Sequence, residues 1–178
     1  MFRCALILSV FLTPLAALAD NGGTLNPEEM SFNSVMAKAI RGKVDMVACS
    51  QGYHITKAGR HAEARILFRR CVDAGYTGAM TWMSQLDDNG LGGPEDAKAA
   101  AAWDKMAAYA GDPIGMFNYG LDLIRGRGVQ RDIDGGRAFI DKAATSGLKI
   151  AQELQDADYD VETVTPDADN WKYRKYVF

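Results

Sequence analysis

The sequence predicts an all-α solenoid, in which antiparallel helix pairs repeat every 36 residues. Evenly spaced glycines give the period: Gly75, Gly111 and Gly147. The glycine loop Asn89–Gly92 recurs 36 residues later as Arg125–Gly128. A fixed period of this length is typical of helical repeat arrays, in which each unit buries its apolar face only against its neighbours.

The first nineteen residues have the pattern of a secretory signal peptide. Arg3 supplies a positive start, Ala5–Leu18 is largely apolar, and Ala17-Leu18-Ala19 forms a small-x-small cleavage site. The apolar run is too short to span a bilayer comfortably, which disfavours an uncleaved anchor. We therefore expect removal of residues 1–19, Cys4 included, and a periplasmic or secreted product.

The composition of the mature chain favours protein partners over nucleic acid. Loss of Arg3 takes the net charge from −3 to −4, whereas nucleic-acid binding calls for a basic patch. Residues 20–157 suffice for one repeat domain with a continuous core. No other apolar stretch approaches membrane-spanning length, so no membrane span is expected after signal cleavage.

The N-terminal elements are expected to cap the array. Asn26-Pro27-Glu28-Glu29 resembles a helix start, because Asn can cap and Pro suits the first turn. The apolar residues that follow recur at helical spacing: Phe32, Val35, Met36, Ala39 and Ile40. A shorter helix pair then covers 44–55 and 61–74, ending at Gly75.

The 36-residue units follow. We expect helices over 77–88, 94–110, 113–124, 132–146 and 149–157, so the array stops halfway through a unit. Small side chains such as Ala107 and Ala143 let paired helices approach, while Trp103 and Phe139 fill the space between units. The loop glycines permit the chain reversals: Gly90, Gly92, Gly126 and Gly128. We expect residues 158–178 to form a largely irregular tail.

Two cysteines remain after signal removal, on opposite helices of the first pair. An even count in an exported chain favours a disulfide between Cys49 and Cys71, with a buried thiol pair or a redox sensor as alternatives. Together with His54 and His61 they contain the atoms of a zinc site. The spacing is wrong for a compact finger and an oxidising compartment opposes free thiolates, so no metal is expected.

The repeat residues resemble the Sel-one-like repeat family, relatives of the tetratricopeptide repeat. The unit from Gly115 to Gly147 keeps these family positions: Gly120, Gly126, Gly128, Val129, Asp132, Lys142, Ala143, Ala144 and Gly147. The unit from Ala79 to Gly111 keeps these: Gly90, Gly92, Asp96, Ala100, Trp103, Ala107, Ala108 and Gly111. It departs from the family at Ser84 and Asp87, and we interpret Asp87 as a sign of a less buried first helix.

The resemblance implies a right-handed α-solenoid that serves as an adaptor surface in protein complexes. It also offers an alternative function. A Helicobacter cysteine-rich subgroup joins the two helices of each unit by a disulfide and is linked to β-lactam binding, so this chain could be a cell-envelope enzyme or β-lactam-binding protein. Fold alone does not decide between these functions.

The sequence carries no signature of catalysis or of a cofactor. Its serines lie in no G-x-S-x-G or S-x-x-K setting, and two histidines leave few triad options. Gly126-Arg127-Gly128 lacks the Lys-Ser/Thr ending of a phosphate loop, and the acidic loops lack the final Glu of a calcium site. We predict a non-enzymatic protein that binds neither cofactor nor metal.

Two groups of residues are candidates for partner binding. Trp82 and Asn118 stand 36 residues apart on the first helices of successive units and are predicted to face a groove, although Trp82 could be a core residue. The C-terminus holds an aromatic cluster among basic residues: Trp171, Tyr173, Tyr176 and Phe178. That cluster either folds back over the end or groove of the solenoid or binds a partner.

Overall fold

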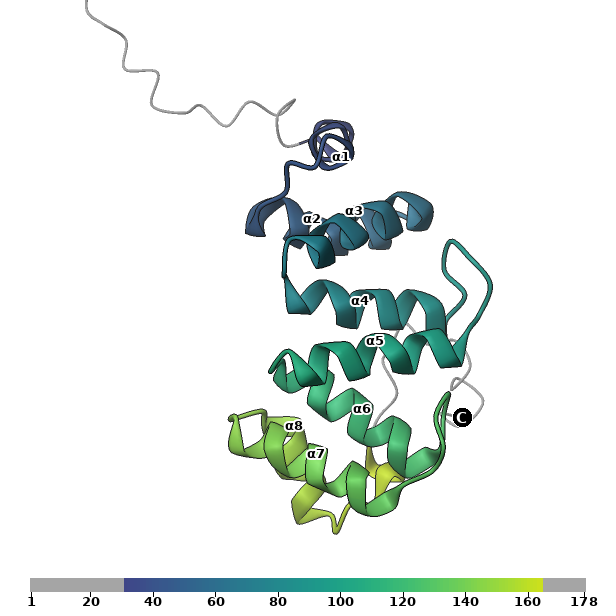
Figure 1. Cartoon of the computed structure of the whole chain (residues 1–178), viewed down its shortest axis with the longest axis vertical. Helices are drawn as coiled ribbons and strands as arrows, with labels where there is room; N and C mark the ends of the chain where they lie inside the picture. Colours follow the sequence, from purple (N-terminus) through teal and green to yellow (C-terminus); the bar gives the residue numbers. More distant parts are fainter. Residues whose placement is uncertain (1–30, 165–178) are drawn as a thin grey trace, which may run out of the picture.

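The computed structural model describes residues 31–164 as eight α-helices and one short 3₁₀ helix, with no β-strand over this range. The elements are α1 (Phe32–Ile40), α2 (Met46–Lys57), α3 (His61–Asp73), α4 (Thr77–Asp88), α5 (Ala97–Tyr109), α6 (Pro113–Arg125), α7 (Ile133–Thr145), α8 (Lys149–Asp156) and η1 (Val161–Thr163). They stack along the long axis of the molecule, from α1 at one end to α8 at the other (Figure 1). The predicted all-α class is confirmed.

The helices form a solenoid of successive pairs. Each helix from α2 to α8 packs mainly on its neighbours in the chain, and α4 also contacts α6 across the array. The pairs are α2–α3, α4–α5 and α6–α7, and α8 adds a final half-unit. This packing of each unit on the adjacent units is the arrangement that the 36-residue period predicts.

Aspartates set the starts of several helices. Asp96 and Asp132, 36 residues apart, accept hydrogen bonds from the backbone N–H groups of Ala99 and Gly135, both at 2.9 Å. The predicted helix start at Pro94 was therefore too early, because Asp96 is the cap of α5. Likewise α1 begins at Phe32 and is capped by the Ser31 hydroxyl, whereas the predicted start at Asn26 lies outside the described residues.

The glycine loops let adjacent units touch through their backbones. All seven predicted turn glycines have positive φ: Gly75, Gly90, Gly92, Gly111, Gly126, Gly128 and Gly147. A Cβ on Gly128 would lie 2.0 Å from the carbonyl oxygen of Ala97. One on Gly92 would lie 2.8 Å from the backbone of the equivalent residues His61 and Ala62. Each loop thus rests on the start of the second helix of the preceding unit, where no side chain fits.

The first pair is closed by the Cys49–Cys71 disulfide, whose Cα atoms are 5.9 Å apart. Cys71 is fully buried, and so are Ala107 and Ala143 at the equivalent positions of the next two units. The disulfide therefore replaces close alanine packing at the same interior position. It also excludes both cysteines as zinc ligands.

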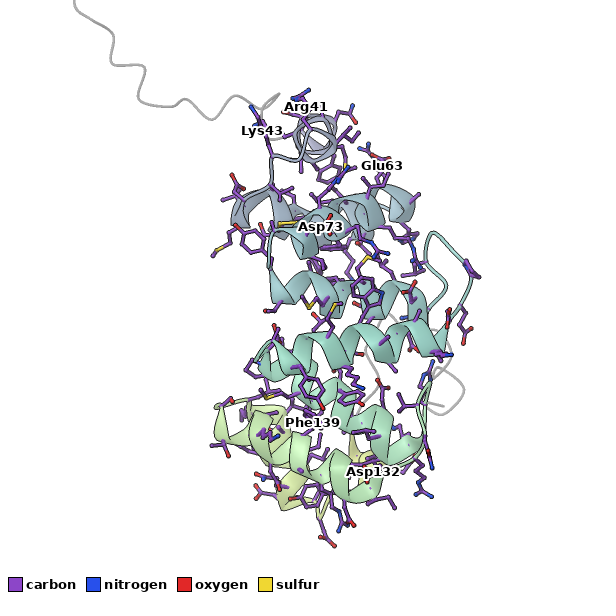
Figure 2. The ribbon with its side chains drawn as sticks, in the orientation of Figure 1. Arg41, Lys43, Glu63, Asp73, Asp132 and Phe139 are labelled. Atoms are coloured by element: carbon purple, nitrogen blue, oxygen red, sulfur yellow. A yellow bond between two sulfur atoms is a disulfide. The ribbon has the colours of Figure 1, made fainter. Side chains whose placement is uncertain are left out.

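Two main apolar clusters hold the array together. One joins α1 to α4, with Leu67, Phe68 and Leu86 at its centre. The other joins α6 to α8, with Ile140 and Leu154 at its centre. Half-buried Trp103 packs on the first cluster. Phe139 of α7 lies against Tyr109 of α5 and Tyr119 of α6, with ring centres 5.8 and 5.0 Å apart (Figure 2).

Asp87 contradicts the expectation of a less buried first helix. Its exposed fraction is only 8%. Its carboxylate accepts hydrogen bonds from Arg65 Nη1 at 2.5 Å and from the Trp103 indole N–H at 2.9 Å. The prediction was wrong because an aspartate can be buried where two donors satisfy both of its oxygens.

Between α8 and the end of the described range, residues 157–164 are irregular apart from η1, and they remain packed on the array. The Tyr159 hydroxyl donates to Asp141 at 2.5 Å, and the Arg137 guanidinium lies 4.9 Å from the Tyr159 ring centre. Arg125 donates to the carbonyl of Val161 at 2.9 Å. None of the helices within residues 31–164 has the length and apolar character needed to cross a bilayer.

Candidate functional site

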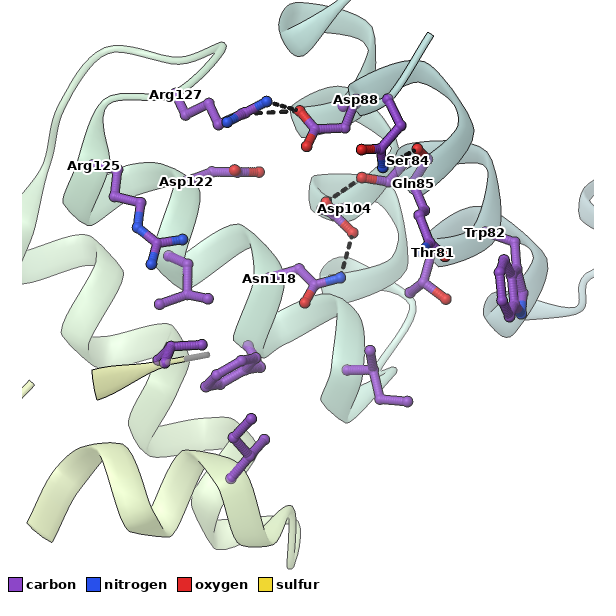
Figure 3. Close-up of a pocket in the computed structure, with 17 residues that line it drawn as sticks. Thr81, Trp82, Ser84, Gln85, Asp88, Asp104, Asn118, Asp122, Arg125 and Arg127 are labelled. Atoms are coloured by element: carbon purple, nitrogen blue, oxygen red, sulfur yellow. Dashed lines mark hydrogen bonds and ion pairs between the residues drawn. The ribbon is translucent and has the colours of Figure 1, made fainter. Parts of the chain in front are cut away.

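A groove of about 510 Å³ runs along the first helices of successive units, between α4, α6 and α8. Its polar wall is shown in Figure 3, where α4, α5 and α6 bring their side chains together. The lining residues are Thr81, Trp82, Ser84, Gln85, Asp88, Asn89, Ala100, Asp104, Ile114, Phe117, Asn118, Leu121, Asp122, Arg125, Arg127, Ile150 and Val164. We refer to this surface as the groove.

The groove has an apolar floor that is open to solvent. Ile114 is 52% exposed and Ile150 is 40% exposed, and these two isoleucines stand 36 residues apart at the starts of α6 and α8. Phe117 and Leu121 lie on the next turns of α6 and are buried. The repeat therefore presents an isoleucine from each of two units to whatever occupies the groove.

Asp104 is the buried acid of the groove, with an exposed fraction of 4%. The Ser84 hydroxyl of α4 donates to its Oδ2, and the Asn118 amide of α6 donates to its Oδ1 at 3.1 Å (Figure 3). Burial raises the pKa of Asp104 to about 7, against these two hydrogen bonds, which lower it. Asp104 thus ties α5 to the first helix of its own unit, α4, and to the first helix of the next unit, α6.

Asp122 is a second acid with a raised pKa. Burial, reinforced by the charges of Asp104 and Asp88, raises its pKa to about 8. Its Oδ2 is buried and has no hydrogen-bond partner within residues 31–164. A buried carboxyl oxygen without a hydrogen-bond partner is unusual in a folded protein.

Two arginines lie at the same end of the groove. Arg127 pairs with Asp88 Oδ1 through Nε at 2.8 Å and Nη2 at 2.5 Å, and this ion pair connects the second glycine loop to α4. Arg125 is exposed and holds the Val161 carbonyl. The groove therefore carries acids in its middle and a cation where the chain leaves η1.

The structure places both predicted groove residues on this surface. Asn118 points to Asp104, and Trp82 lies at the outer edge (Figure 3). Trp82 also stacks on Phe68, with ring centres 5.7 Å apart, and meets Tyr53 edge-on at 5.6 Å. Trp82 thus serves the core and the groove together. The other candidates, Trp171, Tyr173, Tyr176 and Phe178, lie outside the described residues.

Sequence reasoning missed the acids of the groove. Asp104 stands where the next unit has Ile140, and Asp122 stands where the preceding unit has Leu86, and both of these apolar residues are fully buried. A charged residue at a buried repeat position was the available signal. Arg127 was interpreted only as part of a repeat turn.

The described residues give no support for a metal site or a nucleophile. No three potential metal-ligating side chains cluster within 31–164. His54 is exposed beside Tyr53, and His61 lies at the start of α3, so neither approaches the groove acids. The interactions that the groove residues make are hydrogen bonds, an ion pair and apolar contacts.

Comparison with solved structures identifies the fold. A Sel1 repeat protein from Oxalobacter formigenes matches with a TM-score of 0.58 and 24% identity, over 70% of this chain and 96% of its own. The chain has the Sel1-repeat fold. Helicobacter pylori cysteine-rich protein B matches with a TM-score of 0.59 and 14% identity, over 75% of this chain and 98% of its own.

A third Sel1-repeat structure is similar over part of its length. It is c5321, a protective antigen of uropathogenic Escherichia coli strains, with a TM-score of 0.51 and 16% identity, over 75% of this chain and 35% of its own. No protein-family model matches the sequence, and no curated protein does. The similarity is therefore carried by the arrangement of the helices.

Proposed function

We propose that this Sel1-repeat chain is an exported, non-enzymatic scaffold whose groove binds an extended segment of a protein partner. One observation carries the proposal: half-exposed Ile114 and Ile150 lie in one groove with an unsatisfied buried oxygen of Asp122. Binding grooves combine an apolar surface with a few placed polar groups in this way. The Sel1-repeat fold supports a protein partner, since helical repeats present extended concave surfaces.

The disulfide supports export to the periplasm or beyond. Disulfides persist in oxidising compartments, and Cys49–Cys71 joins the helices of the first pair. The predicted signal peptide, residues 1–19, lies outside the described residues. Thiol counting on the denatured protein from native cells tests this. We expect no free thiol until reduction releases two, and two reactive thiols beforehand would contradict export to an oxidising compartment.

Photo-crosslinking in native cells tests the groove as the binding surface. A photoreactive residue replaces Ile114 in the groove, and the matched control replaces Met106, which is 44% exposed on α5 and does not line the groove. We expect a defined protein adduct from position 114, and loss of that adduct when Asp122→Asn is added. Equal adducts from both positions, or an adduct insensitive to Asp122, would contradict the proposal.

The non-enzymatic part of the proposal has its own test, aimed at the β-lactam alternative. The purified chain is incubated with a chromogenic β-lactam, with and without Asp104→Asn. We expect no turnover with either. Turnover that Asp104→Asn abolishes would overturn the assignment, because Asp104 is the buried acid of the groove with a raised pKa.

A further inference from the structure

The described chain ends on the groove itself. Val164 is one of the groove-lining residues, and the fourteen residues 165–178 follow it directly. The course of the chain from α8 to Val164 is fixed, because the Tyr159 hydroxyl is hydrogen-bonded to Asp141 and the Val161 carbonyl is hydrogen-bonded to Arg125. Residues 165–178 therefore begin at one end of the groove, beside α8.

The length of this segment suits the groove. An extended chain advances about 3.3–3.6 Å per residue, so Trp171 can lie up to about 24 Å from Val164 and Arg174 up to about 34 Å. The groove spans three first helices, α4, α6 and α8, and a spacing of roughly 10 Å between successive ones puts α4 about 20 Å from α8. The aromatic residues can therefore reach α6 and α4.

The charges of the segment complement those of the groove. Leaving Val164, the segment carries Asp167 and Asp169 first, and then three cations, Lys172, Arg174 and Lys175. The groove offers Arg125 near Val161, and of its three acids Asp88 is already paired with Arg127, which leaves Asp122 and Asp104 for the cations of the segment. A segment that lies along the groove can therefore place its acids near Arg125 and its cations near these two acids.

We infer that residues 165–178 occupy the groove of their own molecule, with aromatic side chains on Ile114 and Ile150 and a cation donating to Asp122 Oδ2. This inference rests on the proposed function of the groove as a segment-binding surface and identifies its first occupant. The contact satisfies the buried Asp122 oxygen and covers the exposed isoleucines. A partner then binds in competition with the chain's own segment.

Limited trypsin digestion of the full chain tests this, because Lys172, Arg174 and Lys175 are themselves cleavage sites. Ile114→Ser and Asp122→Asn alter the groove, and Ile133→Ser and Asp134→Asn are matched controls on exposed positions of α7 outside it. We expect the groove variants to speed cleavage of the segment by roughly tenfold, since cleavage follows the population of the released state. The controls should change it by less than twofold. Melting curves recorded on every variant separate release of the segment from unfolding.

Three outcomes would overturn the inference. The first is cleavage of the wild-type segment as fast as in the groove variants. The second is equal acceleration in the control variants. The third is protection that disappears on dilution, which would assign the groove to the segment of a second copy. If the segment is not protected but the partner adduct at position 114 still forms, only this inference is refuted. If the segment is protected but no partner adduct forms, only the proposed function is refuted.

Discussion

The two complete repeat units fill the same interior position differently, one with apolar residues and the other with polar ones. In the unit from Gly115 to Gly147, Gly120 packs directly under the Ile140 side chain, and a Cβ on Gly120 would lie 2.7 Å from Ile140 Cδ1. In the unit from Ala79 to Gly111, the equivalent residues are Ser84 and Asp104, joined by a hydrogen bond. One unit fills the space with a methyl group, and the other fills it with a hydroxyl–carboxyl pair.

A second pair of positions changes in the same manner. Leu123 and Phe139 in the later unit correspond to Asp87 and Trp103 in the earlier one, where the indole N–H donates to the carboxylate. The polar residue occurs together with its donor at both places. This comparison teaches that two of the buried acids, Asp87 and Asp104, each come as a matched set with their hydrogen-bond donors. The set that contains Asp104 makes the polar wall of the groove.

Placing a buried carboxyl in the later unit without hydrogen-bond donors should cause the largest loss of stability. Ile140→Asp places a carboxyl opposite Gly120 and Leu154, the equivalents of Ser84 and Asn118, and neither side chain can donate. We expect a loss of roughly 3–5 kcal/mol in unfolding free energy at pH 8, measured by urea denaturation. Ile140→Val, which removes only a methylene, should cost about 1 kcal/mol. Similar losses for the two variants would contradict the matched-set account.

Removing the disulfide should have the next largest effect. The double variant Cys49→Ala, Cys71→Ala gives the first pair the alanine that the later units carry at the equivalent of Cys71. Opening the loop between residues 49 and 71 should cost about 3 kcal/mol, measured by thermal unfolding without reductant. With reductant present, variant and wild type should unfold together. An unchanged variant in the absence of reductant would show that alanine packing alone suffices in all three units.

The raised pKa of Asp104 predicts stability that falls with rising pH. The folded protein keeps this carboxyl protonated up to about pH 7, whereas the unfolded chain releases the proton near pH 4. This contribution to stability is therefore full in acid, declines as the pH rises above the unfolded value, and is lost once the pH has passed the folded value. From pH 5.5 to 8.5 we expect a loss of roughly 2 kcal/mol.

Asp104→Asn tests the share of that decline that belongs to Asp104. Asparagine keeps the shape, can accept from Asn118 and can donate to Ser84, but does not titrate. Urea denaturation at both pH values should show a smaller decline in the variant than in the wild type. An identical decline in variant and wild type would show that Asp104 does not cause the pH dependence of stability.

The smallest effect concerns the indole contact. Trp103→Phe gives the earlier unit the ring of the later one and takes one donor from buried Asp87, which keeps Arg65. We expect a cost of about 1–2 kcal/mol by urea denaturation. Adding Asp87→Leu should not recover the lost stability, because Arg65 would then lose its carboxylate partner and keep only the carbonyls of Leu86 and Leu91. Full recovery of stability in the double variant would show that positions 87 and 103 alone determine this contact and that Arg65 contributes nothing to it.

The period in the sequence predicted the fold, because equal spacing fixes which residues share a turn, a cap or a helix contact. Asp96 and Asp132 cap equivalent helices for this reason, and Gly92 and Gly128 meet equivalent backbones. The helix start near Asp96 was misplaced, since several residues in that stretch can cap and only the hydrogen bond decides.

The polar wall of the groove was harder to predict. Asp104 follows a run of alanines and resembles a solvated helix residue until it is compared with Ile140. Its donors, Ser84 and Asn118, come from two other helices, and their convergence depends on how the units stack. The prediction that Asp87 marks a less buried helix was wrong for the same reason, because its donor Arg65 lies 22 residues away in the chain.

The central claim is that the groove holds an extended aromatic segment, and methyl NMR of the full chain tests it most directly. Ring currents from aromatic side chains should shift the δ-methyl signals of Ile114 and Ile150 in the groove. Ile133, also 40% exposed but outside the groove, is the internal control. We expect the double variant Trp171→Ala, Tyr173→Ala to move the two groove signals and leave Ile133 in place. Unmoved groove signals, or equal movement of Ile133, would contradict the claim.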